Sequence, residues 1–266
     1  MEIGKLKDLD SRSHGNDSPN IMSPEILFED NDILAVNKPA GLVVHSDGKT
    51  SEPTLVDWII EKFPEARDVG EPWRGQNGEE ILRSGIVHRL DRDTSGVMLV
   101  AKTQKGFECL KKQFQNRTIK KEYEAFVWGF VKNDKGTIDR PIGRSRSDFR
   151  KWSAQRGARG EMREAVTDYE VVFRFEKGGG KYTLVRAFPH TGRTHQIRVH
   201  LKAINYPIVG DYLYGPKKEN ALGFSRPALH ARAITFLDIA DREHTVEAPY
   251  QQDFRVAREE SAICKL

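Results

Sequence analysis

Apolar residues along most of this chain alternate with polar ones in short runs, and Gly, Pro, Asn and Asp separate the runs. A period of two with such boundaries is typical of β-strands joined by turns. The first regular pattern begins near Ile26 and indicates two strands around Asn31 and Asp32. An uninterrupted apolar run over 97–101 indicates a strand covered on both faces. Further strands are predicted over 122–131, 165–175, 181–188, 232–239 and 244–249.

Three segments carry apolar residues at the three- and four-residue spacing of an amphipathic helix. In the first, Thr54 and Asp57 resemble a capping box, and Pro64 ends the apolar face. The second helix is predicted around 107–114 and the third over 197–204. Candidate N-terminal caps of the third helix are Thr191, Gly192 and Thr194.

Strands outnumber helices in this pattern, and several consecutive strands are close enough to form hairpins. We therefore predict the α+β class, with a large, mainly antiparallel mixed β-sheet flanked by helices and loops. The patterning divides the chain into a flexible N-terminal arm at 1–23, one folded body at 24–250 and a C-terminal tail at 251–266.

Composition narrows the class of protein. Lys and Arg number 43 and Asp and Glu 39, a mildly basic balance that is compatible with an anionic partner. Two cysteines, Cys109 and Cys264, are too few for a disulfide framework or a zinc-type cysteine cluster, which indicates a reducing compartment. No run of 18 apolar residues occurs, and the N-terminus carries charges where a secretory signal would be apolar. We expect a cytoplasmic protein with no membrane partner.

One strongly charged stretch separates two apolar runs. In GIVHRLDRDTSGVMLV, residues 85–100, all but one of the positions 88–93 are ionisable. The simplest interpretation is a solvated turn, because the residues from Asp93 to Gly96 are all common turn formers. Leu90 lies inside the charged stretch, however, so we expect part of it to face the interior.

A second segment, HTGRTHQIRVHLKAI at 190–204, supplies cations for this stretch, and Arg198 would lie at the edge of its helical face. An ionised carboxylate out of water is costly unless a cation and hydrogen bonds compensate it, and a guanidinium fork matches a carboxylate best. An aspartate paired with Arg198 could act as a nucleophile or a base. Spacing alone leaves open whether that aspartate is Asp91 or Asp93.

The histidines of the same segment, His190, His195 and His200, raise the alternative of a metal site. Five-residue intervals, at about 100° per residue, do not bring side chains to one helical face. No HExxH pattern accompanies them. We therefore expect no metal, and helix capping or phosphate contacts suit these histidines better.

Cations also gather in DRPIGRSRSDFRKWSAQRGARGEMR, residues 139–163, where Phe149 and Trp152 lie between them. A charge run is most often a solvated surface. Arginines interleaved with aromatic side chains on a mobile loop are also what RNA backbone neutralisation and base stacking require. Both interpretations stay open for this segment.

Four motifs together resemble the RluA-type family of RNA pseudouridine synthases: GIVHRLDRDTSGVMLVAKT, KKEYEAFVWG, RPIGR and HTGRTHQIRVHLKAINYPIVGDYLYG. The resemblance runs from about Ile26 to Pro249. It implies a pseudouridine synthase catalytic domain over 24–250 and an enzyme that isomerises selected uridines in structured RNA. Neither a cofactor nor a metal is implied, because the reaction has no net redox change and uses no hydrolytic water.

The resemblance also assigns roles to residues. The aspartate of the HRLD motif is the family's catalytic carboxylate, which selects Asp91 over Asp93, either as a nucleophile at the ribose or as a base on a neighbouring ribose carbon. Tyr123 matches a tyrosine expected to contact the uracil and help remove the ring proton, and Arg198 matches the arginine paired with the catalytic aspartate. Arg89 is expected to enter the RNA stack when the target base flips out. The other residues expected at the substrate are His88, Ile197, Arg144, Arg146, Arg193 and His195.

The expected partner is therefore ribosomal or transfer RNA, and a monomer is the simplest oligomeric state. A competing hypothesis is an inactive RNA-binding protein that retains the fold. The intact Asp91, Tyr123 and Arg198 argue against it.

Overall fold

The computed structural model describes residues 23–46, 52–71, 73–74, 80–81, 83–146, 148, 150–154, 158–216 and 221–265. The predicted N-terminal arm lies outside these residues, apart from Ser23. None of the helices formed by the described residues is long and apolar enough to cross a membrane.

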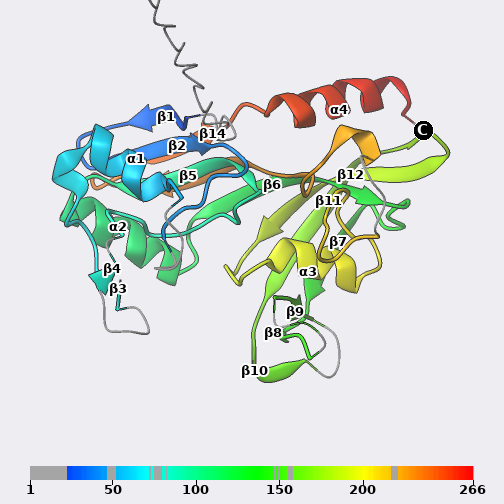
Figure 1. Cartoon of the computed structure of the whole chain (residues 1–266), viewed down its shortest axis with the longest axis horizontal. Helices are drawn as coiled ribbons and strands as arrows, with labels where there is room; N and C mark the ends of the chain where they lie inside the picture. The colour runs from blue at the N-terminus through cyan, green and yellow to red at the C-terminus, as the bar shows by residue number, and fades with distance from the viewer. Residues whose placement is uncertain are drawn as a thin grey trace, which may run out of the picture.

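Among the described residues, nine strands form one large sheet: β1 (Glu25–Glu29), β2 (Ile33–Lys38), β5 (Ser95–Ala101), β6 (Lys120–Trp128), β7 (Lys135–Asp139), β11 (Val166–Lys177), β12 (Gly180–Pro189), β13 (Leu229–Leu237) and β14 (Glu243–Glu247). The order is β1, β2, β5, β13, β6, β12, β11 and β7, with β14 paired to β13 (Figure 1). Every pairing is antiparallel except that of β5 with β13. The predicted α+β class with a mainly antiparallel mixed sheet is confirmed.

The strand β5 follows the charged stretch directly, and all of its residues are buried, as its uninterrupted apolar run predicted. Its first residues run parallel to β13, where Ser95 pairs with His230. Gly96 has a φ of +116°, and a Cβ on it would meet the carbonyl oxygen of Ala231 at 2.1 Å. Only glycine lets the two strands approach this closely. The close approach fixes the point at which the charged stretch enters the sheet.

The two earlier predicted helices form as expected. α1 (Leu55–Lys62) begins with a capping box, in which the Thr54 hydroxyl accepts the N–H of Asp57 and the Asp57 carboxylate accepts the N–H of Thr54. α2 (Gln104–Gln115) turns Phe107 into the core. Short 3-10 turns lie at η1 (Pro64–Ala66) and η2 (Ala221–Gly223), and β3 (Trp73–Arg74) pairs with β4 (Glu80–Ile81).

The third helix, α3 (Gln196–Ala203), starts differently from the prediction. None of the caps predicted within 191–194 fills the N-cap position, which His195 takes in the left-handed conformation without a capping hydrogen bond from its side chain. Gln196, the first residue of the helix, instead holds the preceding turn, because its Oε1 accepts the Thr191 hydroxyl at 2.7 Å and the N–H of Arg193 at 3.0 Å. Its amide nitrogen donates to β11, which ties the start of α3 to the sheet.

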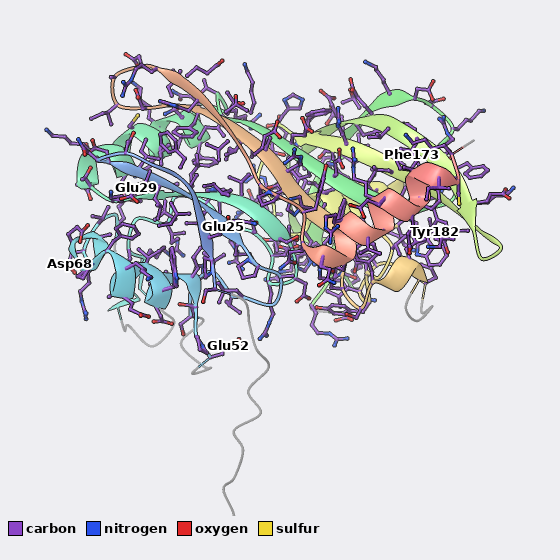
Figure 2. The ribbon with its side chains drawn as sticks, turned by 90° about the horizontal axis from the view of Figure 1, so that it is seen from above. Glu25, Glu29, Glu52, Asp68, Phe173 and Tyr182 are labelled. Atoms are coloured by element: carbon purple, nitrogen blue, oxygen red, sulfur yellow. The ribbon has the colours of Figure 1, made fainter. Side chains whose placement is uncertain are left out.

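Most of the predicted C-terminal tail forms a helix instead, α4 (Gln252–Ile263). Its Phe254 and Ala257 are buried, and the ring of Phe254 lies 5.1 Å from that of Phe126 in β6. Figure 2 shows α4 from above, lying across the strands near Phe173. Figure 1 shows it on the opposite side of the sheet from α2 and α3. The apolar surface that receives this helix is distant in sequence, so the short pattern alone did not identify it.

Two hydrophobic clusters pack against this one sheet. The first gathers side chains of β2, β5, α1 and α2, and the second those of β6, β11, β12, α3 and α4. Tyr123 of β6 packs against both clusters. The middle of the sheet is therefore where the two clusters meet.

The basic segment at 139–163 is partly strand rather than wholly mobile loop. Its described residues form β8 (Ile142–Arg144), β9 (Trp152–Ser153) and β10 (Arg159–Arg163), in the order β10, β8, β9. A small cluster that includes Ile142, Val199 and Tyr214 packs this small sheet beside α3. The cations of the segment are thereby placed next to the helix that carries Arg198.

Candidate active site

A pocket of about 490 Å³ lies over the middle of the sheet. It is lined by the loop that leads into β5, by the end of α2 with the start of β6, and by the turn from β12 into α3. Among the described residues that line it, Asp91 is the only acid. The cations that line it are Arg89, Arg117, Lys121, Arg193 and Arg198. The pocket therefore suits an anionic ligand and presents one carboxylate to it.

Asp91 lies in the turn that precedes β5, where its carbonyl oxygen accepts the N–H of Thr94 at 3.1 Å. Nη1 of Arg198 donates to Oδ2 of Asp91 at 3.1 Å. The carboxylate of Asp93 instead lies 3.5 Å from the hydroxyl of Tyr212. The structure thus brings Arg198 to Asp91, which is the alternative that the HRLD motif had selected.

Arg198 is also held by a second carboxylate, that of Asp211. Nε of Arg198 donates to Oδ2 at 2.7 Å and Nη2 donates to Oδ1 at 2.9 Å. The side chains of Arg198 and Asp211 are 4% and 0% exposed, against 22% for Asp91. Burial alone would lower the pKa of Arg198, but the hydrogen bonds and charge of Asp211, with a further contribution from Asp91, outweigh it and raise the pKa. Arg198 is therefore a fixed cation between two carboxylates, and the more exposed carboxylate faces the pocket.

Lys38 anchors the loop of Asp91. This side chain is fully buried at the end of β2, and its Nζ donates to the carbonyl oxygens of Pro39, Leu42 and Arg92 at 2.8, 2.8 and 2.9 Å. Burial lowers the pKa of Lys38 to about 7. Because Arg92 follows Asp91 directly, the ammonium group fixes the backbone beside the carboxylate.

Tyr123 and Lys121 line the pocket from one face of β6. Burial, reinforced by the charge of Asp91, raises the pKa of Tyr123 well above its usual range, so the phenol keeps its proton. Burial lowers the pKa of Lys121 to about 8, and its Nζ lies 3.4 Å from the carbonyl oxygen of Thr191. Both side chains offer hydrogen-bond donors to a ligand at neutral pH.

His195 lies between Tyr214 and Asp91. Its Nδ1 is 2.8 Å from the Tyr214 hydroxyl, and its Nε2 is 4.0 Å from Oδ2 of Asp91. The Tyr214 oxygen already accepts the N–H of Trp152 at 2.9 Å, so the hydroxyl proton is free to donate to Nδ1. Burial lowers the pKa of His195, which favours the neutral ring. In this tautomer Nε2 carries the ring proton on the side of Asp91.

Four further predicted residues line the pocket: His88, Arg89, Arg193 and Ile197. Arg89 is exposed and Ile197 is buried. The ring of His88 is largely committed to the fold, because its Nε2 accepts the N–H of Leu99 at 2.8 Å and it stacks on Phe114. Burial lowers the pKa of His88 to about 3, so the ring is neutral.

Arg144 and Arg146 lie outside the described pocket. Both are exposed, and the guanidinium of Arg144 stacks over the ring of Trp152 at 4.3 Å. They belong to the small sheet and its edge, beside α3 rather than at the carboxylate. Any contact they make with a ligand is therefore with a part that extends beyond the pocket.

Of the other two histidines of the 190–204 segment, His190 lines the pocket and His200 does not. His190 contacts the Asp168 carboxylate at 2.7 Å. His200 is fully buried and is hydrogen-bonded to Thr167 at 2.9 Å, so the expectation of a capping or phosphate contact was wrong for it. The described residues contain no group of three His, Cys, Asp or Glu side chains that could hold a metal ion.

Sequence reasoning missed Asp211, Tyr214 and Lys38. Asp211 is the one acid in the otherwise mostly apolar stretch IVGDYLYG. Lys38 is the last residue of the largely buried strand β2. A charged residue adjoining apolar runs was the available signal in both places, because such a residue needs a buried partner.

Comparisons with known proteins give consistent results. Residues 32–203, which include Asp91, Tyr123 and Arg198, match the family model described as RNA pseudouridylate synthase. The chain is 40% identical to the uncharacterized RNA pseudouridine synthase YlyB of Bacillus subtilis, over 87% of this chain and 71% of that protein. It is 38% identical to ribosomal large subunit pseudouridine synthase D of Pseudomonas aeruginosa, over 86% of this chain and 69% of that protein. The solved structure of human RNA pseudouridylate synthase domain containing 1 matches with a TM-score of 0.68 and 25% identity, over 94% of this chain and 86% of that chain.

Proposed function

Because the chain belongs to the RNA pseudouridylate synthase family, it is an RNA pseudouridine synthase, and we propose that Asp91 is its catalytic carboxylate and ribosomal RNA its substrate. One observation carries the assignment of Asp91: its carboxylate lies 3.1 Å from the buried guanidinium of Arg198, in the wall of a cationic pocket. The ribosomal substrate is supported by the name of the Pseudomonas aeruginosa relative.

The reaction exchanges one bond of the ribose carbon C1′ for another. The bond from C1′ to N1 of uracil breaks, the base turns, and C1′ bonds to C5. C5 then loses a proton and N1 gains one, so no oxidant, reductant or water is consumed. The Asp91 carboxylate acts beside the ribose, either by attacking C1′ or by removing the C2′ proton, and Arg198 holds it in position for that step.

The other pocket residues suit contacts with the base. Tyr123 and Lys121 present donors from β6, and His195 presents its ring proton from the start of α3. Tyr123 keeps its proton because burial raises its pKa, which suits a ring that packs against the uracil. Its help in removing the C5 proton stays a prediction, as does the insertion of the exposed Arg89 into the RNA stack.

The test of the catalytic role compares Asp91→Asn with Asp93→Asn. RNA labelled with tritium at C5 of uridine releases tritium when pseudouridine forms, so the release rate measures the reaction. We expect Asp91→Asn to lower this rate at least about a hundredfold while RNA binding persists, because a positioned carboxylate contributes at least that much. Asp93→Asn removes an equal charge two residues away and is expected to stay close to wild type. Equal rates in wild type and Asp91→Asn would overturn the role of Asp91.

The substrate class is tested with RNA from cells that lack the gene. Ribosomal and transfer RNA are separated, incubated with the enzyme and digested, and pseudouridine is quantified by mass spectrometry. We expect new pseudouridine in ribosomal RNA. New pseudouridine in transfer RNA alone would overturn the ribosomal assignment and leave the isomerase activity standing.

A further inference from the structure

Tyr212 is an exposed aromatic residue in a loop that also contains buried residues. It is 63% exposed, whereas Asp211 directly before it and Tyr214 two residues after it are 2% and 6% exposed. No other aromatic ring among the described residues pairs with it. A ring left in water contributes little to folding, so packing does not account for an aromatic side chain at this position.

The backbone on both sides of Tyr212 is fixed. Oδ1 of Asp211 accepts the N–H of Leu213 at 3.0 Å and that of Tyr214 at 3.1 Å. The carbonyl oxygen of Asp211 accepts the N–H of Gly215 at 2.8 Å. The loop therefore presents the ring from a rigid base, and little conformational entropy would be lost when a ligand stacks on it.

The ring lies against the turn that carries Asp91 and Asp93 but outside the residues that line the pocket. Its hydroxyl is 3.5 Å from Oδ2 of Asp93, whose Cα is at most about 7 Å along the chain from that of Asp91. Its neighbour Asp211 pairs with Arg198, which in turn pairs with Asp91. A polynucleotide that delivers one base to the pocket would pass its adjacent nucleotide close to this ring.

A cation, Arg150, belongs to a neighbouring segment. The segment that carries Arg150 contacts the loop of Tyr212, because the N–H of Trp152 donates to the hydroxyl of Tyr214 at 2.9 Å. The side chain of Arg150 is 64% exposed and donates to the Asp148 carboxylate from Nε and Nη2. A surface ion pair of this kind is weak, so a phosphate can compete with Asp148 for the guanidinium. An aromatic face with an adjacent guanidinium is the arrangement that binds single-stranded nucleic acid, by stacking a base and neutralising its phosphate.

We propose that Tyr212 is a stacking platform for an unpaired base next to the target uridine. The inference rests on the proposed function and adds to it a specific contact outside the pocket. The partner is an RNA strand that is unpaired at the target, because a base inside a duplex has no free face to stack on the ring.

The experiment measures the affinity of the full-length protein for a fluorescein-labelled oligouridine by fluorescence anisotropy. Tyr212→Ala removes the ring, Tyr212→Phe keeps the ring and removes the contact with Asp93, and Ile239→Ala is the control. Ile239 is an apolar side chain of comparable exposure, 49%, in the turn between β13 and β14. We expect Tyr212→Ala to weaken binding about five- to a hundredfold, the range for loss of one base–aromatic stack, and Tyr212→Phe to retain most of the affinity.

Two results would overturn the inference: wild-type affinity in Tyr212→Ala, or an equal loss in Tyr212→Phe, which would assign the effect to the hydroxyl group. In the tritium-release assay, Tyr212→Ala is expected to raise KM by a larger factor than it lowers kcat. A wild-type protein that binds RNA without releasing tritium would overturn the proposed function instead. The affinity ranking of the Tyr212 variants would still decide the stacking role.

Discussion

Replacing Asp211 by Asn tests whether the second carboxylate is what keeps Arg198 in place. In the wild type, Oδ1 of Asp211 accepts three hydrogen bonds, from Nη2 of Arg198 and the N–H groups of Leu213 and Tyr214. Oδ2 accepts one, from Nε of Arg198 at 2.7 Å. Asparagine can keep the first three with its own oxygen. Its NH2 group then faces the Nε–H of Arg198, donor against donor, and the negative charge is lost.

The magnitude follows from burial. Removing one partner of a buried ion pair costs about 3–5 kcal/mol, because the other charge is left without compensation. Asp91 still offsets part of the charge of Arg198, so we expect the lower end of that range, about 3 kcal/mol of unfolding free energy. The guanidinium is also expected to shift toward Asp91 or solvent, which would displace the Asp91 carboxylate and, if Asp91 has the proposed role, lower kcat.

The assay combines urea unfolding with tritium release. Asp238→Asn is the matched control, because the Asp238 side chain is 1% exposed and pairs with Arg242 and His244 after β13, away from the pocket. The control is expected to lose stability and keep the wild-type kcat, whereas Asp211→Asn should lose both. If Asp211→Asn lost less than about 1 kcal/mol and kept its kcat, the dependence of Arg198 on Asp211 would be refuted.

Three further predictions follow from the same contacts. Lys38→Met leaves the buried carbonyl oxygens of Pro39 and Leu42 without this donor, and that of Arg92 with only the N–H of Gly41, and should lower the unfolding free energy in urea by at least about 2 kcal/mol; wild-type stability would show that the ammonium is dispensable. His88 has a pKa lowered by burial to about 3, so its contribution to stability is present above about pH 6.5 and is lost as the pH falls toward 3. His88→Gln should therefore show a shallower loss of unfolding free energy below pH 6.5, by up to about 1.4 kcal/mol per pH unit, and an unchanged slope would contradict the burial of this ring. Replacing Arg144 and Arg146 together by Ala should flatten the dependence of log K on log salt for single-stranded RNA by about 1.4, or about 0.7 per phosphate contact, and an identical slope would return the segment to plain surface.

Much of the fold could be predicted because its elements carry local patterns. The alternation in β6 and β12, the apolar run of β5 and the capping box before α1 each lie within a dozen residues. The helix α4 could not be predicted in this way. Its Phe254 and Ala257 are buried only because they pack on strands that are distant in sequence.

The candidate site could be predicted in part. The charged stretch before β5 and the cations of α3 could be recognised as candidate site residues, because they are charged residues among apolar ones. The HRLD motif distinguished Asp91 from Asp93. The partner of Asp211 could not be identified, because the pairing depends on Asp211 facing Arg198, which lies 13 residues earlier and on a different element. Arg144 and Arg146 resembled site residues by charge, yet they lie on the small sheet outside the described pocket.

The sequence by itself determined where three of the helices and most strands of the large sheet form, the class of the fold and which segments hold the reactive groups, because backbone propensity and side-chain period act between near neighbours. The tertiary structure decided which charges meet: Asp91 with Arg198, Arg198 with Asp211, and Lys38 with the carbonyl oxygen of Arg92. Ion pairs and buried hydrogen bonds depend on distances of about 3 Å between residues far apart in the chain. The periodicity of apolar residues carries no information about which two distant residues come within about 3 Å of each other. That pairing is fixed only when the strands and helices pack together.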